Sequence, residues 1–247
     1  MRWRLRTWQT RQRRLRFYRQ FIPHGGLCFD VGANVGNRAD LFLALGARVI
    51  AVEPVAETAA LLRQRFAQNS RLIVLETALD ATEGQTTITV CSPHWLSSIS
   101  ADWLAATERT GRFPRRKIIA KRVTSLTTLD HLISVYGVPA FIKIDVEGYE
   151  LQVLRGLSQP VPTLSFEYHP ETLHEAAACL EHLTSLGALH ANFSRGESLT
   201  WALPEWQTPA QLLAQLNEET THDRLQFGDI YVRYERPHYQ QKTGRSS

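Results

Sequence analysis

Residues 28–36 read CFDVGANVG, an apolar run that ends in an acid and then enters a glycine turn. A buried strand, a glycine turn and a helix form the junction at which many α/β proteins bind a nucleotide-type ligand. In the dinucleotide-binding form of this turn, three glycines let a pyrophosphate approach the bare backbone. Here the first of those positions is Asp30, whose carboxylate would repel a pyrophosphate and attract a cation. The turn therefore predicts a ligand with an ammonium group, and it disfavours a nicotinamide oxidoreductase.

The rest of the chain alternates short apolar runs with amphipathic helical patterns. This alternation is typical of a mostly parallel sheet covered by helices on both faces. Seven segments are predicted as strands of that sheet: 27–31, 48–53, 71–77, 140–145, 163–167, 189–193 and 229–234. Two further β-branched segments, 86–91 and 117–124, interrupt the rhythm and predict a β insertion after the third strand. Helices are expected at 37–45, 57–68, 127–136, 147–157 and 170–186, whereas 194–228 shows no clear pattern.

Charge divides the 247 residues into a basic N-terminal segment and a mildly acidic body. Residues 1–21 hold eight arginines and no acid, whereas the remainder holds 20 lysines and arginines against 24 acids. We therefore expect a helical arm over 1–22, one catalytic domain over 23–237 and a polar tail over 238–247. No apolar run is long enough to span a membrane, so we expect a cytoplasmic protein.

The arginine-rich arm has a broad aromatic face on a helical projection. Five of its large side chains fall on that face: Trp3, Trp8, Leu15, Tyr18 and Phe21. Two others, Leu5 and Phe17, fall off it. Such a helix either contacts an anionic membrane or a nucleic acid, or packs its aromatic side chains on the domain while its arginines face water. Peripheral contact with a membrane therefore stays a candidate role for the arm.

Polar side chains follow the carboxyl ends of several predicted strands, where an open parallel sheet binds its ligand. Glu53 lies 23 residues after Asp30, where an acid can accept both hydroxyl groups of a ribose. Ala78, Leu79 and Asp80 follow the third strand and are placed to line an adenine. A ribose that carries an amino acid and no phosphate is S-adenosylmethionine. Together these positions predict that cofactor.

A second signal is the segment 142–157, IKIDVEGYELQVLRGL. Lys143 and Asp145 lie on the same face of a strand that is otherwise apolar. Because a buried lysine is costly without a partner, we expect Lys143 to pair with a strand-end carboxylate. Asp145 would then stand at the mouth of the cleft, beside the transferable methyl group. Glu147 is interpreted as a helix-capping acid, since an acid suits a helix N-terminus.

The segments LCFDVGANVG, AVEP, TALD, SSIS, TLD and IKIDVEGYELQVLRG together resemble the FkbM-type methyltransferase family. The resemblance implies a Rossmann-like class I methyltransferase that uses S-adenosylmethionine to methylate a hydroxyl group of a small molecule, a sugar, or a glycan- or lipid-linked acceptor. It implies cofactor contacts from these positions: Asp30, Gly32, Ala33, Asn34, Gly36, Glu53 and Pro54. It also implies an active-site role for Asp145 and places Ser97 and Ser98 near the cofactor or the acceptor, with Lys143 as a further candidate substrate contact.

Transfer of a methyl group to an alcohol requires removal of the hydroxyl proton, and a positioned base typically contributes ~10²–10⁴-fold. His169 is the candidate base, because histidine titrates near neutral pH. Glu167 is expected to orient His169 and, with Asp145, to shape the acceptor pocket. These three residues also carry metal-ligand atoms, but no tight ligand spacing supports a metal site, and none is expected.

Two alternative functions remain open from the sequence. A nucleic-acid methyltransferase would use the arginine-rich arm, but enzymes that methylate the exocyclic amines of bases commonly carry an Asp/Asn-Pro-Pro-aromatic turn, and this chain has IDVEG. A nucleic-acid partner is therefore not expected. A nucleotide-binding protein without catalytic activity is the second alternative, and the intact set of strand-end acids argues against it.

Overall fold

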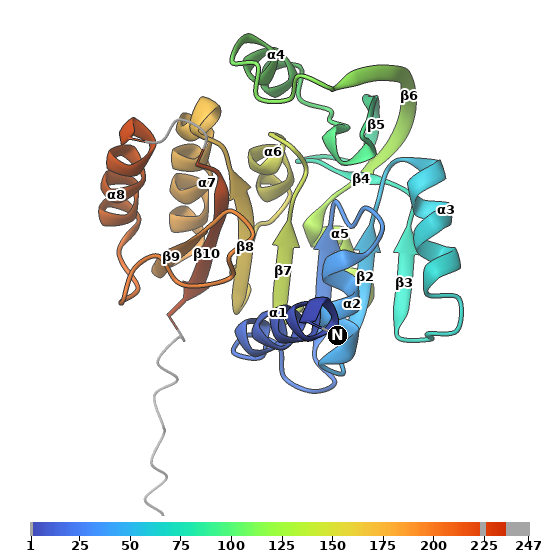
Figure 1. Ribbon diagram of the computed structural model, residues 1–247, viewed down its shortest axis with the longest axis horizontal. Coiled ribbons are helices and arrows are strands. Elements are labelled where there is room, and N and C mark those ends of the chain that lie inside the picture. Colours follow the sequence, from blue (N-terminus) through green and yellow to red (C-terminus); the bar gives the residue numbers. More distant parts are fainter. Residues whose placement is uncertain (1, 223–225, 236–247) are drawn as a thin grey trace, which may run out of the picture.

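The computed structural model describes residues 2–222 and 226–235. Its centre is a sheet with the strand order β3-β2-β1-β7-β8-β10-β9 (Figure 1). The seven strands are β1 (Leu27–Val31), β2 (Arg48–Val52), β3 (Leu72–Leu75), β7 (Phe141–Ile144), β8 (Thr163–Tyr168), β9 (Leu189–Arg195) and β10 (Gly228–Tyr234). The first five in this order pair in parallel, and β10 runs antiparallel to both of its neighbours. The predicted α/β class with a mostly parallel sheet is confirmed.

Alternate residues of β1 belong to two hydrophobic cores, one on each face of the sheet, because successive side chains of a strand point to opposite faces. Leu27, Phe29 and Val31 pack in a cluster with residues of α5 (Leu129–Tyr136), α6 (Glu150–Arg155), α7 (Leu173–Leu186) and α8 (Pro209–His222). Cys28 packs in a second cluster with residues of α1 (Arg2–Tyr18), α2 (Asn37–Ala44) and α3 (Ala56–Arg65). Burial on both faces explains why the strand reads as a continuous apolar run.

A second, three-stranded sheet follows β3 in the chain. It comprises β4 (Ala78–Leu79), β5 (Gly84–Ser92) and β6 (Lys117–Thr127), in the order β4-β6-β5. Between β5 and β6 lie a short 3-10 helix, His94–Leu96, and the helix α4 (Ala101–Arg109), which the sequence did not predict. Figure 1 shows this excursion above the carboxyl ends of the main strands. Residues 84–127 are called the excursion below.

The arm packs on the domain through its C-terminal part. Leu15, Phe17 and Tyr18 are buried in the second core, together with Ile22. The predicted aromatic face is therefore partly wrong, because Phe17 is buried and Trp8 is 60% exposed. Hydrophobic packing against the domain, rather than the projection of an isolated helix, decides which side chains turn inward. The side chains of Trp3 and Leu5, and the tail 238–247, lie outside the described residues.

Two other expectations about helices need correction. The helix predicted over 147–157 begins at Glu150, and Glu147 lies before it with a φ of 55°. The region without a clear pattern contains α8. Its start is marked by a reciprocal capping box, in which Thr208 N donates to Gln211 Oε1 and Gln211 N to Thr208 Oγ1. Within the described residues, no helix has both the length and the apolar character needed to cross a membrane.

Candidate functional site

A cavity of about 590 Å³ lies between the carboxyl ends of the main strands and the excursion. The loops after β1, β2, β7 and β8 form one side of it, and the excursion forms another. The residues predicted from sequence that line it are Gly32, Ala33, Asn34, Glu53, Pro54, Ala78, Leu79, Ser97, Ser98, Asp145, Glu167 and His169. Most of the predicted site thus comes together in one place.

The glycine turn after β1 lets two loops meet. Gly32 has a φ of 78°, and a Cβ atom there would lie 1.8 Å from the carbonyl oxygen of Asp145. No residue with a side chain fits that approach, so glycine is required both by conformation and by space. Gly36 begins α2 with a φ of 83°, and a Cβ there would lie 2.5 Å from Leu62 Cδ1. Leu62 therefore packs directly on Gly36, and a side chain at this position of the turn would clash with it.

Glu53 is held in one orientation by the backbone around it. Its Oε2 accepts a hydrogen bond from Asn34 N, and its Oε1 accepts one from Val55 N, both at 2.9 Å. Burial raises the pKa of Glu53 to about 7. The carboxyl group lines the cavity and keeps acceptor positions beyond those two hydrogen bonds, because each carboxyl oxygen has two lone pairs. It can therefore accept hydroxyl groups of a ligand.

Three predicted cofactor contacts, Asp30, Gly36 and Asp80, are not among the residues that line the cavity. Asp30 is buried in β1, in register with Lys143 of β7, and burial raises its pKa to about 7. Asp80 accepts a hydrogen bond from the hydroxyl group of Tyr149 at 2.8 Å, and Tyr149 does line the cavity. The sequence reasoning missed Tyr149, which lies 69 residues from its partner.

Lys143 is wholly buried and lies between two carboxylates. Its Nζ is 3.1 Å from Asp145 Oδ2 and 3.0 Å from Asp229 Oδ1. The expected pairing with a strand-end carboxylate is present, but Lys143 itself does not line the cavity. Although burial opposes ionisation of Asp145, the positive charges of Lys143 and Arg38 hold its pKa below the usual value. Asp145 therefore presents an ionised carboxylate to the cavity.

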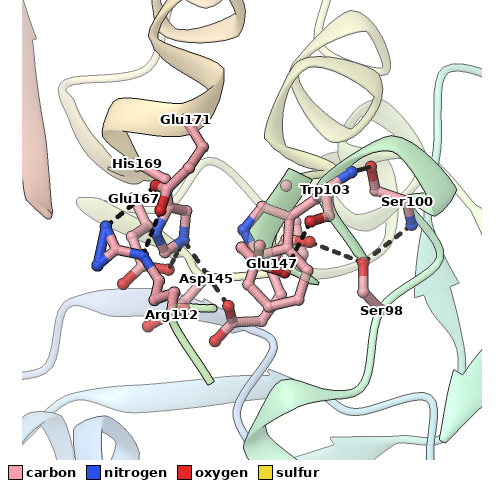
Figure 2. Close-up of polar contacts among 12 residues, drawn as sticks. Ser98, Ser100, Trp103, Arg112, Asp145, Glu147, Glu167, His169 and Glu171 are labelled. Carbon is pink, nitrogen blue, oxygen red and sulfur yellow. Dashed lines mark hydrogen bonds and ion pairs between the residues drawn. The ribbon is translucent and has the colours of Figure 1, made fainter. Parts of the chain in front are cut away.

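Glu147, Glu167 and His169 form a cluster that lines the cavity near β8, three strands along the sheet from β2, which Glu53 follows (Figure 2). His169 Nε2 is 3.0 Å from Glu167 Oε2 and 3.7 Å from Glu147 Oε2. Burial raises the pKa of Glu147 well above its usual value, and the charge of Glu167 raises it further. Burial, followed by the charge of Asp145, does the same for Glu167. Both carboxyl groups therefore favour their protonated forms more than an exposed glutamate does.

The imidazole of His169 is fixed by aromatic neighbours from distant parts of the chain. The ring centroids of Trp103 and His169 are 5.5 Å apart. The ring of Phe227 stacks on the imidazole, with the two centroids 6.2 Å apart. Trp103 also packs on Gly148, where a Cβ would lie 2.3 Å from Trp103 Cβ. Sequence reasoning missed both aromatic residues, because neither belongs to a motif.

Glu147 is not the helix cap that the sequence predicted. Its positive φ turns its side chain into the cavity, and a non-glycine residue in this conformation is strained and often functional. Glu150 caps the turn instead, because its Oε1 accepts hydrogen bonds from Val146 N at 3.1 Å and Gly148 N at 3.4 Å. The glycine at 148, which interrupts the helical pattern, was the available sequence signal.

The serine pair connects the excursion to this turn. Ser98 Oγ donates to the carbonyl oxygen of Glu147 at 2.7 Å and accepts from Ser100 N at 2.9 Å. Ser97 Oγ accepts from Cys91 N at 3.0 Å. Both serines line the cavity, and Ser98 holds the backbone of Glu147 in place.

Two arginine groups at the cavity were missed by the sequence reasoning. Arg112 forms a buried, bidentate ion pair with Glu171, with Nε–Oε1 and Nη2–Oε2 distances of 2.9 and 3.1 Å. Arg38 Nη2 lies 2.7 Å from Glu197 Oε1, and Arg14 of the arm reaches the same carboxylate at 3.6 Å. Because the partners of these arginines lie far away in the sequence, no local pattern predicts the ion pairs.

The cluster also has the donor atoms that a metal site would use. Glu147, Glu167 and His169 bring one ligand atom each to within 4.8 Å of one another. Two of these atoms, His169 Nε2 and Glu167 Oε2, are already in direct hydrogen-bond contact. In this geometry the groups are partners of one another, as an acid–base cluster requires.

The chain matches the Methyltransferase FkbM domain over residues 30–192. A comparison with curated proteins found no match. Among solved structures, the chain is similar to a precorrin-6y C5,15-methyltransferase from Geobacter metallireducens, at 9% identity and a TM-score of 0.48, covering 90% of this chain and 86% of that one. It is similar to a putative O-methyltransferase from Klebsiella pneumoniae at 9% identity and a TM-score of 0.46, covering 92% and 80%. It is also similar to Aeropyrum pernix fibrillarin with bound S-adenosyl-L-methionine, at 10% identity and a TM-score of 0.41, covering 86% and 68%.

Proposed function

The chain belongs to the FkbM methyltransferase family, and from that premise we propose that it transfers a methyl group from S-adenosylmethionine to a hydroxyl group. The acceptor is a small molecule, a sugar, or a glycan- or lipid-linked molecule. One observation carries this proposal: a single cavity has nucleoside-type contacts at one end and a buried imidazole–carboxyl cluster at the other. The order of the five parallel strands, β3-β2-β1-β7-β8, supports a Rossmann-like class I fold.

The residues at the glycine turn fit this cofactor. Bound there, S-adenosylmethionine supplies a methyl group on a positively charged sulfur. Gly32 leaves the backbone bare beside Asp145, and the oriented carboxyl group of Glu53 suits the two ribose hydroxyls. Ala78 and Leu79 offer an apolar wall for the adenine. Asp145 remains ionised and suits the positively charged end of the cofactor.

The opposite end of the cavity suits a hydroxyl group that must lose its proton. His169, whose Nε2 is hydrogen-bonded to Glu167, takes up this proton as part of the cluster that it forms with Glu147 and Glu167. Trp103 and Phe227 keep the ring from turning away. Proximity then contributes most of the rate, because the protein has only to align the oxygen with the methyl group.

The test is transfer of labelled methyl groups into a cell extract that is separated into small metabolites, glycans, lipids and nucleic acids. We expect the label in one of the first three fractions. His169→Ala should lower turnover by ~10²–10⁴-fold while cofactor binding, measured by calorimetry, stays unchanged.

The matched control is His182→Ala, whose imidazole contacts the backbone of Leu157 far from the cluster. It should keep full turnover. Label in the nucleic acid fraction would replace the proposed acceptor class. Near-normal turnover of His169→Ala would remove the proposed base, and absence of heat with the cofactor would remove the methyltransferase proposal itself.

A further inference from the structure

Residues 111–127, which lead into and form β6, are both basic and apolar. They contain six lysines and arginines and no acid. The side chains of Arg112 and Arg116 are buried in ion pairs, and the exposed cations are Arg115, Lys117, Lys121 and Arg122. Three aliphatic side chains in this stretch are largely exposed: Ile118 at 63%, Ile119 at 63% and Val123 at 72%. Exposed aliphatic side chains of this size are costly in water unless something covers them. This combination is called the β6 surface below.

Among the residues that the structure describes, no strand pairs with the outer edge of β6 over most of its length. One edge pairs with β5 from Lys117 to Leu126, whereas β4 pairs only with Leu126 and Thr127 on the other side. The register with β5 shifts past Ile119, and such irregularities bend a strand and turn its side chains outward. Figure 1 shows β6 arching along the outside of the molecule, above the carboxyl ends of the main strands.

The excursion that carries this surface also forms a wall of the cavity. Trp95, Arg112 and Phe113 line the cavity, and Trp95 is itself 47% exposed. A partner that covered the β6 surface would therefore lie next to the cavity.

We propose that the β6 surface docks on an anionic lipid bilayer. Its lysines and arginines are attracted to anionic headgroups, and its aliphatic side chains enter the headgroup region. A second copy of this chain fits poorly, because two such strands would bring like charges together, and lysines on an open strand edge oppose edge-to-edge pairing. A nucleic acid would match the charge, but its bases stack on aromatic side chains, whereas this surface is aliphatic.

The test is co-sedimentation of the full chain with vesicles, in the absence of a methyl donor. We expect binding to vesicles of phosphatidylcholine with phosphatidylglycerol, no binding to phosphatidylcholine alone, and a loss of binding as salt rises. Because no methyl donor is present, the outcome is independent of the proposed reaction.

Two pairs of variants identify the surface. Ile119→Ser/Val123→Ser should weaken vesicle binding by about tenfold or more, while Val135→Ser/Val138→Ser, at valines 56% and 55% exposed elsewhere, should not. Lys117→Glu/Lys121→Glu should weaken binding at least as much. The corresponding reversal in the exposed part of the arm, Arg13→Glu/Arg16→Glu, should have the smaller effect.

Several outcomes would overturn the proposal. They are equal binding by wild type and the β6 variants, loss of binding in the arm variant alone, and no binding to anionic vesicles at low salt. A dimer seen by light scattering that Val123→Ser dissociates, without vesicle binding, would assign the surface to a second copy. RNA binding that Lys117→Glu/Lys121→Glu weakens, without vesicle binding, would assign it to nucleic acid.

Discussion

At Gly32 the loops after β1 and β7 approach so closely that a methyl group would meet the carbonyl oxygen of Asp145 at 1.8 Å. The backbone on both sides belongs to buried strands and cannot retreat cheaply. We predict that Gly32→Ala destabilises the fold by ~3 kcal/mol or more, since it combines a steric clash with a positive φ. Denaturant unfolding of the purified variant measures this loss.

Gly111 provides the control for this prediction. It has a φ of 65°, and a Cβ there meets no atom within 4 Å. Gly111→Ala should therefore cost only the conformational strain, about 1 kcal/mol. Equal losses in the two variants would show that the backbone at Gly32 has room to move.

Asp30 gives the protein a specific dependence on pH. Burial raises its pKa from the ordinary value of 3.8 to about 7, so the folded state binds the proton more tightly than the unfolded state. This contribution to stability is fully present below the ordinary pKa and is lost as pH rises toward 7. Asp30→Asn removes this titrating group. We predict that, between about pH 4 and pH 7, the free energy of unfolding of the variant falls less than that of wild type, by on the order of 2 kcal/mol.

Denaturant unfolding at a series of pH values measures the effect. Asp102→Asn, at an exposed position of α4, is the control and should reproduce the wild-type profile. If Asp30→Asn runs parallel to wild type across this range, then Asp30 does not titrate there in the folded protein.

At the scale of elements, the arm is stabilised by aromatic packing rather than by its arginines. Phe17 contacts the rings of Tyr18, Phe21, Trp201 and Tyr231. These rings come from both ends of the chain, so the helix closes one face of the sheet. We predict that Phe17→Ala lowers the free energy of unfolding by ~3–5 kcal/mol, because it removes a large side chain from a core.

Trp8 lies on the same helix but is 60% exposed, which makes Trp8→Ala the matched control. It should change stability by no more than about 0.5 kcal/mol. Both variants are compared by thermal and denaturant unfolding. A Phe17→Ala variant as stable as wild type would mean that the Phe17 ring contributes nothing to the stability of the fold.

At the scale of the whole molecule, the cavity lies between the main sheet and the excursion. A ligand that binds the folded state adds about 2.7 kcal/mol of stability at a concentration 100 times its Kd. We therefore predict that saturating S-adenosylmethionine raises Tm by about 5–10 °C, given the usual response of a domain of this size. Differential scanning calorimetry measures the shift.

The demethylated product, S-adenosylhomocysteine, should also raise Tm, whereas NADH should not. Glu53→Gln should reduce the shift, because it removes a carboxyl group that the backbone orients toward the cavity. A shift with NADH and none with S-adenosylmethionine would contradict the cofactor assignment.

Much of the fold was predictable because its signals are local. Each strand of the main sheet overlaps a predicted segment. The central strands are easiest to predict, because burial on both faces requires a continuous apolar run. The insertion after the third strand was visible from its β-branched segments, but α4 within it was not. Its cap, Ser100, accepts from Trp103 N, and that helix is held by Trp103 packing on Gly148. Contacts of this kind leave no periodic pattern.

By itself, the sequence determined the α/β class, the glycine turn, Glu53 and the family motif, because strand periodicity and the spacing of strand ends place these along the chain. Only the tertiary structure decided which acids face the cavity. Asp30 is buried within β1 and does not line the cavity, Asp80 bonds to Tyr149, and Glu147 turns into the cavity through a positive φ. The physical reason is that the direction of a side chain after a strand depends on loop conformation and on neighbours from distant segments, and no local pattern encodes either.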